Sequence, residues 1–291
     1  MYPQIIRICS RENYLYGLPK EVSVVGLKVN KPLFERLNIP LPSKEWNWDD
    51  FYNIALQFSR DINSDGINDI YLYKASSTNR IIFSLLQSWG KDFVDINKKQ
   101  CYFNTEEFIS MINYLKNLID RNLILIGNAG TNITNDNIGM TESLVSFITE
   151  SVYGEDFIYL NYPMNKAGYC YKAESAKLCI NKKSSNKLLA AKFLGIYASR
   201  EVSKNFFSDG FYKDKSIYVK PDDKVRGSKF IDSEQLDDVY EFILDNAKEW
   251  TFTTDMNKVV TDGINEFLSG KINARESAES IQKKIEMMLK E

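Results

Sequence analysis

The residues whose types and spacing best suit a chemical role lie at positions 61–69, in the run Asp-Ile-Asn-Ser-Asp-Gly-Ile-Asn-Asp. Oxygen-bearing residues occupy positions 1, 3, 5 and 9 of an EF-hand-type loop, and Gly66 occupies position 6, where such loops turn sharply. Position 12 is Leu72, so the usual bidentate glutamate is absent. The run predicts a structural calcium (Ca²⁺) site, and the alternative is a solvated acidic turn. The expected ligands are Asp61, Asn63, Asp65, Ile67 and Asp69.

Few residue patterns in this chain are typical of an enzyme active site. It contains no histidine, which excludes Ser-His and Cys-His nucleophilic pairs and histidine–zinc sites. The pairs Asp49/Asp50 and Glu106/Glu107 could be proposed for glycosidase acid–base work. Neighbouring residues on a helix point in different directions, however, and acids in a first turn already stabilise the helix N-terminus. We therefore predict a protein that is not an enzyme, with a glycoside hydrolase as the rival interpretation.

The overall composition is that of a globular protein without a nucleic-acid partner. In 291 residues there are 37 Lys and Arg against 39 Asp and Glu, a net charge of −2, and no basic stripe follows the chain. No apolar run is long enough to span a bilayer. Four cysteines show no CxxC spacing. Cys170 and Cys179 either face each other across a hairpin or are isolated small hydrophobic residues, and the spacing leaves both open.

Strand and helix signals alternate, which favours an α/β architecture. Val22–Val29 is β-branched and apolar and predicts a strand. Asn47 predicts a helix start because it is a good cap followed by two acids. Thr105 can cap a second helix, and Gly270 suits the end of a later one. Further helices are expected at Asn186–Ala198, Arg200–Phe207, Glu234–Ala247, Met256–Ser269 and Ala274–Lys290.

Several phrases, taken in order, resemble a known family. They are Tyr16–Pro19 followed by Asn30–Phe34, then Trp46–Phe51, Trp89–Phe93, Ala190–Leu194 and Phe267–Lys271. Together they are similar to the extracellular solute-binding proteins of ABC sugar importers, the maltose-binding-protein-like group. The chain departs from the family pattern at Val29, where an aromatic is common, and the family's opening strands and export signal have no counterpart before Tyr16.

The resemblance implies a periplasmic-binding-protein-like α/β fold with two lobes, the N-terminal lobe being incomplete. It implies capture of a carbohydrate between the lobes and delivery to an ABC permease in the membrane. In the intact family the protein is extracellular or periplasmic, membrane-associated and often a lipoprotein, whereas the first residues here do not form a secretory signal. A truncated remnant without a transport role is the alternative. The expected lobe segments are 1–21, 22–171, 172–224 and 225–291, the first and third belonging to the N-terminal lobe.

The resemblance also implies a set of ligand-contacting residues at the cleft edges. Aromatic faces stack on a pyranose ring, and amide or carboxylate groups bind its hydroxyls. The expected ligand-binding residues are Ser23, Asn79, Arg80, Glu142, Phe147, Trp250, Met256 and Asn257. Because helices such as Leu188–Tyr197 would lack the sheet that they normally pack on, the incomplete lobe is also expected to self-associate or to be weakly ordered.

Overall fold

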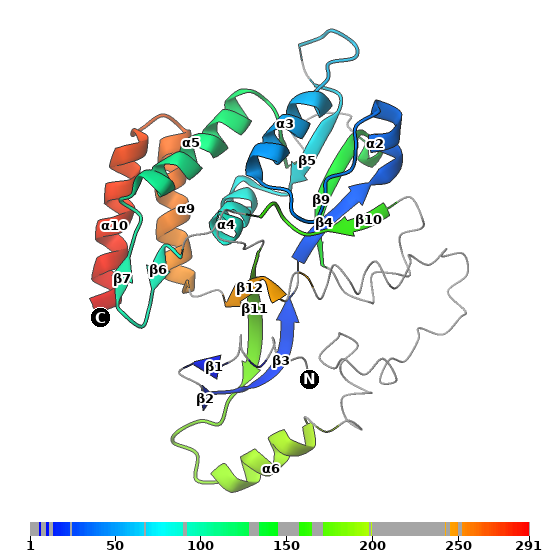
Figure 1. Cartoon of the computed structure of the whole chain (residues 1–291). Coiled ribbons are helices and arrows are strands. Elements are labelled where there is room, and N and C mark those ends of the chain that lie inside the picture. Colours follow the sequence, from blue (N-terminus) through cyan, green and yellow to red (C-terminus); the bar gives the residue numbers. More distant parts are fainter. Residues whose placement is uncertain are drawn as a thin grey trace, which may run out of the picture. The chain divides into compact units, whose positions relative to one another are not determined.

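The computed structural model (Figure 1) describes residues 6, 10–11, 14–23, 25–66, 68–89, 92–127, 134–144, 157–164, 171–197, 199, 242, 245–249 and 252–290. By its contacts the chain divides into two compact units. Unit 1 comprises Met1–Lys31, Glu142–Asn161 and Tyr171–Glu249, and unit 2 comprises Pro32–Thr141, Tyr162–Cys170 and Trp250–Glu291. The predicted lobes grouped residues 22–31 and 142–161 with 32–141. The contact-based division instead places residues 22–31 and 142–161 in unit 1, and the lobe segments stay a prediction.

Unit 1 is built from strands that pair mostly antiparallel. Strand β11 pairs antiparallel with β3 and parallel with β12, while β4 pairs antiparallel with β10, and β1 with β2. The predicted strand at Val22–Val29 is found as the end of β3 and most of β4. The bounds are β1 Ser10–Arg11, β2 Tyr14–Leu15, β3 Leu18–Ser23, β4 Val25–Asn30, β10 Phe157–Leu160, β11 Tyr171–Leu178 and β12 Ala247–Glu249.

Unit 2 has parallel strands at its centre. Strand β5 (Tyr71–Ala75) pairs in parallel with β8 (Leu125–Ile126) on one side and with β9 (Ile138–Leu144) on the other. The buried side chains of Tyr71, Leu125 and Ile138 form a core cluster on these three strands. A short hairpin pairs β6 (Val94–Asp95) with β7 (Gln100–Cys101). Parallel strands joined through helices confirm the α/β prediction.

The helices of unit 2 begin where the sequence places good caps. Asn47 forms a capping box, since its side chain accepts from the backbone N–H groups of Asp49 and Asp50 while Asp50 accepts from the Asn47 N–H. Thr105 accepts from the Phe108 N–H. The bounds are α2 Lys31–Leu37, α3 Trp48–Phe58, α4 Thr78–Ser88, α5 Glu106–Asp120, the 3₁₀ turn Asn135–Asn137, α9 Thr254–Leu268 and α10 Ala274–Lys290.

Helices α9 and α10 lie close together because a glycine faces an isoleucine. A Cβ built on Gly263 would lie 2.6 Å from Cγ1 of Ile281. The hydroxyl of Ser277 donates to the Gly263 carbonyl at 2.8 Å. Gly270, predicted to end α9, follows it with φ +76°, a left-handed conformation suited to glycine.

One of the expected helices is wrong at its end, and another lies outside the described residues. The prediction for Glu234–Ala247 is wrong at its end, because Ala247 begins β12 and pairs with Tyr171. The helix expected at Arg200–Phe207 lies outside the described residues, as does Cys170, while Cys179 is a free, exposed thiol. Within the described part of the chain, no helix is long and apolar enough to cross a membrane.

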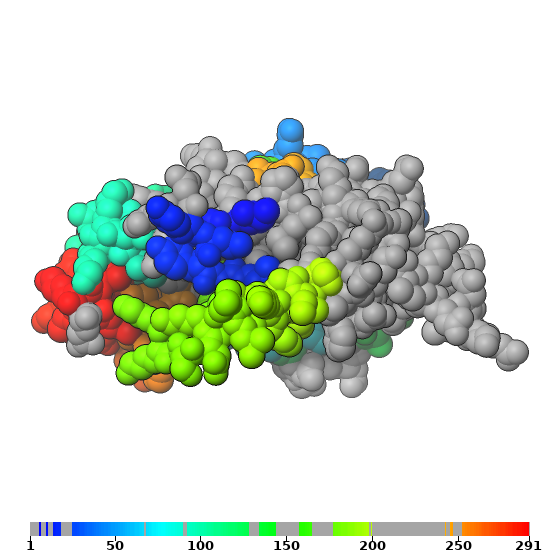
Figure 2. All heavy atoms as spheres, turned by 90° about the horizontal axis from the view of Figure 1, so that it is seen from below, coloured from blue at the N-terminus to red at the C-terminus, as the bar shows by residue number. Residues whose placement is uncertain are grey.

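Helix α6 (Lys187–Tyr197), the expected helix of unit 1, has none of its residues buried. Leu188, Leu189, Phe193 and Ile196 are 73, 67, 61 and 63% exposed. Figure 2 shows α6, in yellow-green, lying open on the side of unit 1 that also carries the blue N-terminal residues. Tyr14, Leu15 and Tyr16 of the same unit are likewise 68, 48 and 62% exposed.

Candidate functional site

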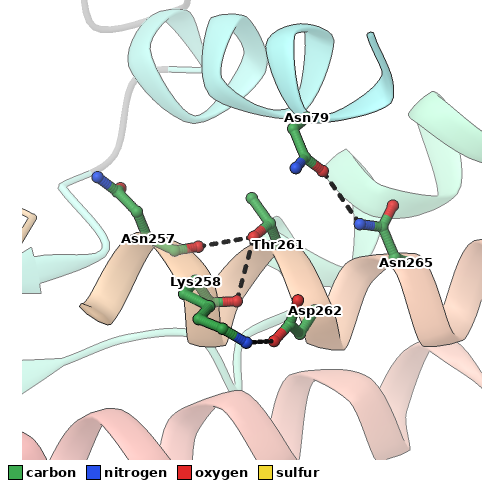
Figure 3. Close-up of polar contacts among 6 residues, drawn as sticks. All are labelled: Asn79, Asn257, Lys258, Thr261, Asp262 and Asn265. Carbon is green, nitrogen blue, oxygen red and sulfur yellow. Dashed lines mark hydrogen bonds and ion pairs between the residues drawn. The ribbon is translucent and has the colours of Figure 1, made fainter. Parts of the chain in front are cut away.

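The N-terminal turns of α4 and α9 in unit 2 carry four of the residues expected to bind a ligand. Ser77 caps α4 by accepting from the Arg80 N–H at 3.2 Å, and Thr253 caps α9 by accepting from the Met256 N–H at 3.2 Å. These caps set where the two helices begin. Asn79 and Asn257 therefore lie in the first turns of α4 and α9 (Figure 3).

Amide side chains join the two helices. The Asn265 amide donates from Nδ2 to Oδ1 of Asn79 at 3.0 Å. Figure 3 shows Asn257, Thr261 and Asn265 on the side of α9 that faces α4. Their spacing of four residues places them on one face of the helix. We call Asn79, Asn257, Thr261 and Asn265 the amide strip.

One member of the amide strip has an acceptor without a partner. Oδ1 of Asn257 is buried and makes no hydrogen bond with any residue that the structure describes. The neighbouring Thr261 hydroxyl does not donate to it, because that hydroxyl is directed to the backbone carbonyls of Asn257 and Lys258 at 2.9 and 3.1 Å. An unmet buried acceptor costs about 1–3 kcal/mol. Asn257 thus carries an acceptor that the described residues leave unused.

The charged groups on this stretch of α9 lie apart from the amide strip. The Lys258 ammonium is 2.8 Å from the Asp262 carboxylate, on the side of the helix away from α4 (Figure 3). The hydrogen bond from this exposed pair raises the pKa of Lys258. The three amide-strip residues on α9, which face α4, all carry neutral side chains. That chemistry suits an uncharged, hydroxyl-rich ligand.

The other expected ligand residues are placed as follows. Arg80 lies in α4 and is half-buried, whereas Met256 is only 5% exposed and packs in the core of unit 2, so its side chain offers no open surface. Ser23 ends β3, and Glu142 lies half-buried in the last part of β9, which belongs with Ser23 to unit 1. Phe147 and Trp250 lie outside the described residues.

Sequence reasoning did not single out Thr261 or Asn265. Their signal was available, because they follow Asn257 at intervals of four residues on a helix whose extent was predicted. Polar residues repeat at the same spacing on the solvated faces of helices, so the spacing alone does not identify a binding site. Only the facing Asn79 on α4 distinguishes this face.

The Asp61–Asp69 loop is closed by its own hydrogen bonds. Asp61 accepts from the backbone N–H groups of Ser64, Asp65 and Gly66, the shortest at 2.7 Å. Asp69 accepts from Ile62 N–H at 2.8 Å. Gly66 has φ +87°, as the sharp turn at position 6 requires.

These contacts agree with a turn and leave the calcium site untested. Ile67 lies outside the described residues. Among the residues that the structure describes, no group of three or more acidic, cysteine or histidine side chains is arranged to hold a metal ion. The Asp61 carboxylate instead accepts hydrogen bonds from three backbone N–H groups. Calcium at this loop stays a prediction.

Comparison with known proteins identifies the fold. No family model and no curated protein matches the sequence. The structure is similar to an ABC substrate-binding protein from Listeria monocytogenes in complex with cycloalternan, with TM-score 0.68 and 14% identity over 99% of this chain and 75% of that one. It is similar to a cyclic α-maltosyl-1,6-maltose binding protein from Arthrobacter globiformis, with TM-score 0.67 and 16% identity over 99 and 75%.

A third solved structure, of the maltose-bound T. maritima protein MalE3, matches with TM-score 0.63 and 14% identity over 99% of this chain and 76% of that one. The chain therefore has the fold of ABC sugar-binding proteins. The expected two-lobed α/β fold class is confirmed.

Proposed function

We propose that this chain, which has the fold of ABC sugar-binding proteins, is a solute-binding component that captures a carbohydrate for an ABC importer. The solved structures that share its fold include proteins named for binding cycloalternan, cyclic maltosyl-maltose and maltose. At 14–16% identity to these, the shared fold does not carry their ligands over, so the proposal rests on the chemistry of this chain's own residues.

The observation that carries the proposal is the buried acceptor of Asn257, beside the amide strip of α4 and α9. Neutral amides bind sugar hydroxyls with directional hydrogen bonds. A ligand hydroxyl that donates to Oδ1 of Asn257 removes the cost of the unmet acceptor. Binding energy thus comes from a group that the ligand-free protein leaves unsatisfied.

Calorimetry with maltose, maltoheptaose and tagatose tests the proposal directly. We expect saturable binding of at least one saccharide, and Asn257→Leu should weaken it roughly tenfold, the worth of about one hydrogen bond. The ligand-free Asn257→Leu protein should melt no lower than the parent, since no partner of Oδ1 is lost. The matched control is Asn97→Leu, at an exposed asparagine between β6 and β7.

Two results would contradict this function. Steady hydrolysis of a chromogenic glycoside by the purified protein would favour the glycoside hydrolase alternative. Full saccharide affinity in Asn257→Leu would remove the amide strip from the site. In the second case Ser23, Arg80 and Glu142 remain as the untested ligand residues, each to be changed to alanine in turn.

The proposal includes a membrane permease as partner and a place outside the cytoplasmic membrane. Both follow from what a solute-binding component does: it hands its ligand to a transporter on the side where the solute arrives. Attachment as a lipoprotein belongs to the same proposal. Pull-down of the saccharide-loaded protein by a candidate permease reconstituted in nanodiscs, compared with the ligand-free protein, measures the interaction.

We also propose that the chain self-associates through α6. Leaving a Leu, Ile or Phe side chain uncovered forgoes roughly 1.5–3 kcal/mol, and α6 has four such side chains that are more than 60% exposed. A second copy of the chain covers them. Sedimentation equilibrium should show a concentration-dependent dimer that Phe193→Ser weakens, while a protein that stays monomeric at high concentration contradicts the proposal.

A further inference from the structure

A second feature of unit 2 has the make-up of a carbohydrate surface, and it lies on α3, α5 and the end of α4. Four aromatic rings form a connected cluster there. Trp89 is 5.3 Å from Tyr114 and 6.3 Å from Trp48, and Tyr52 is 6.1 Å from Tyr114, all between ring centroids. The elements that carry the cluster are labelled in Figure 1.

The two tryptophans of this cluster differ in a way that separates core from surface. Trp48 is 6% exposed, and its indole N–H donates to the Ser88 carbonyl at 3.4 Å. Trp89 is half-buried, and its indole N–H makes no hydrogen bond with any residue that the structure describes. Trp48 is therefore the floor of the cluster, and Trp89 belongs to its open side.

Tyr114 and Tyr52 extend the row of rings from Trp89 and are held in place by their hydroxyls. The Tyr114 hydroxyl donates to the Trp48 carbonyl at 2.7 Å, and burial raises its pKa. The Tyr52 hydroxyl accepts from Arg121 and donates to the Asn117 amide oxygen at 3.4 Å. Both rings are half-buried. Fixed rings lose little conformational freedom when a ligand stacks on them.

Polar groups border this row of rings. The guanidinium of Arg121 lies 5.8 Å from the Tyr52 ring, and both Arg121 and Asn117 are exposed. Asp49, in the first turn of α3, is exposed and acts on Tyr114 through its charge. Aromatic faces bordered by amide, carboxylate and guanidinium groups are what a sugar chain requires for its C–H faces and hydroxyls.

We propose that Tyr52, Tyr114 and Trp89 form an accessory platform for a glycan of two or more sugar units, separate from the amide strip. The row is longer than a single ring, since its two intervals are 6.1 and 5.3 Å. One sugar stacks near Trp89, whose indole N–H donates to a hydroxyl, and the glycan continues toward Tyr52 and Arg121. The inference shares only the ligand class with the proposed function.

Fluorine NMR of protein labelled with 5-fluorotryptophan tests the platform, with maltoheptaose and cellohexaose as probes. The chain has four tryptophans, and the Trp89 signal is assigned as the one absent in Trp89→Phe. We expect that signal to move saturably with one of the glycans, and the signal of the buried Trp48 to move far less. Tyr52→Ala should weaken this binding up to roughly tenfold, whereas Tyr52→Phe keeps the ring and should bind nearly as well.

These experiments test the amide strip and the aromatic platform independently of each other. Asn257→Leu should lower the calorimetric affinity and leave the titration of the Trp89 signal unchanged. A Trp89 signal that does not move at saturating concentrations of both glycans overturns the platform, whatever calorimetry shows. An equal Trp89 titration in Tyr52→Ala, folded by its melting curve, also overturns it.

Discussion

Helices α10 and α6 are both rich in apolar residues, yet one buries its apolar face and the other does not. In α10 the buried residues Ala278, Ile281, Ile285 and Leu289 recur every three or four positions, with charged residues between them. In α6 apolar residues occur nearly all round the helix, and none is buried. A helix with apolar residues on every side is stable only when it is covered on more than one side. The described part of unit 1 does not provide that cover.

The contrast teaches that an apolar sequence does not by itself place a residue in a core. The strongly periodic α10 needs cover on one face only, and α9 and α5 of unit 2 supply it. In helix α6 only Ala190, Leu194 and Tyr197 are half-buried. In the dimer that we propose, the second copy covers the remaining apolar residues of α6.

The largest expected effect compares two phenylalanines. Phe108 of α5 is fully buried and Phe193 of α6 is 61% exposed. Phe108→Ala should lower the free energy of unfolding by about 3–5 kcal/mol, because it leaves a cavity in a packed core. Phe193→Ala should change the stability of the dilute, monomeric protein by less than about 1 kcal/mol.

Urea denaturation of both variants at low protein concentration measures the difference. The two units can unfold in separate steps, so each transition is fitted on its own. A loss in Phe193→Ala as large as that in Phe108→Ala would show that α6 is covered within the single chain. The contrast between the two helices would then be wrong.

A smaller effect is expected where α10 meets α9. Gly263→Ala places a methyl group 2.6 Å from Cγ1 of Ile281, and either the isoleucine or the helices must shift. Overpacking of this kind costs about 1–3 kcal/mol. The control is Gly195→Ala in α6, where a Cβ meets nothing within 4 Å. That change should stabilise the helix slightly, since alanine favours helix over glycine. Thermal melting of the two variants should move in opposite directions.

Gln282 ties α10 to the chain that precedes α5. Its side-chain oxygen accepts from the Phe103 N–H at 2.7 Å, and its Nε2 donates to the Cys101 carbonyl at 2.9 Å. Gln282→Leu should cost about 1–3 kcal/mol, because two partly buried backbone groups lose their partners. Gln282→Glu keeps the acceptor and should cost less. Equal losses in the two variants would show that packing, and not hydrogen bonding, fixes Gln282.

The sequence predicted those parts of the fold that depend on local signals. The caps at Asn47 and Thr105, and the end of α9 at Gly270, are confirmed because each is set by neighbouring residues. Strand β12 was missed because Ala247 pairs with Tyr171, a partner that local periodicity does not reveal. The candidate site divides in the same way. Asn79 and Asn257 were expected, but their alignment on facing helices depends on packing between distant segments.

The smallest expected effect belongs to the Asp61–Asp69 loop, which extends the comparison to an exposed segment held by polar contacts alone. Asp61→Ala should lower the free energy of unfolding by about 1 kcal/mol even without metal, since three backbone N–H groups lose their acceptor and turn to water. Asp65→Ala keeps those three contacts and loses one with Asn63 at 3.1 Å, so it should cost less.

If the loop binds calcium, excess calcium raises the melting temperature of the parent by mass action, and both substitutions abolish that rise. Melting curves in calcium and in chelator separate the two roles. Identical curves for the parent, with Asp61→Ala still destabilised, would show that this carboxylate serves the turn and not a metal.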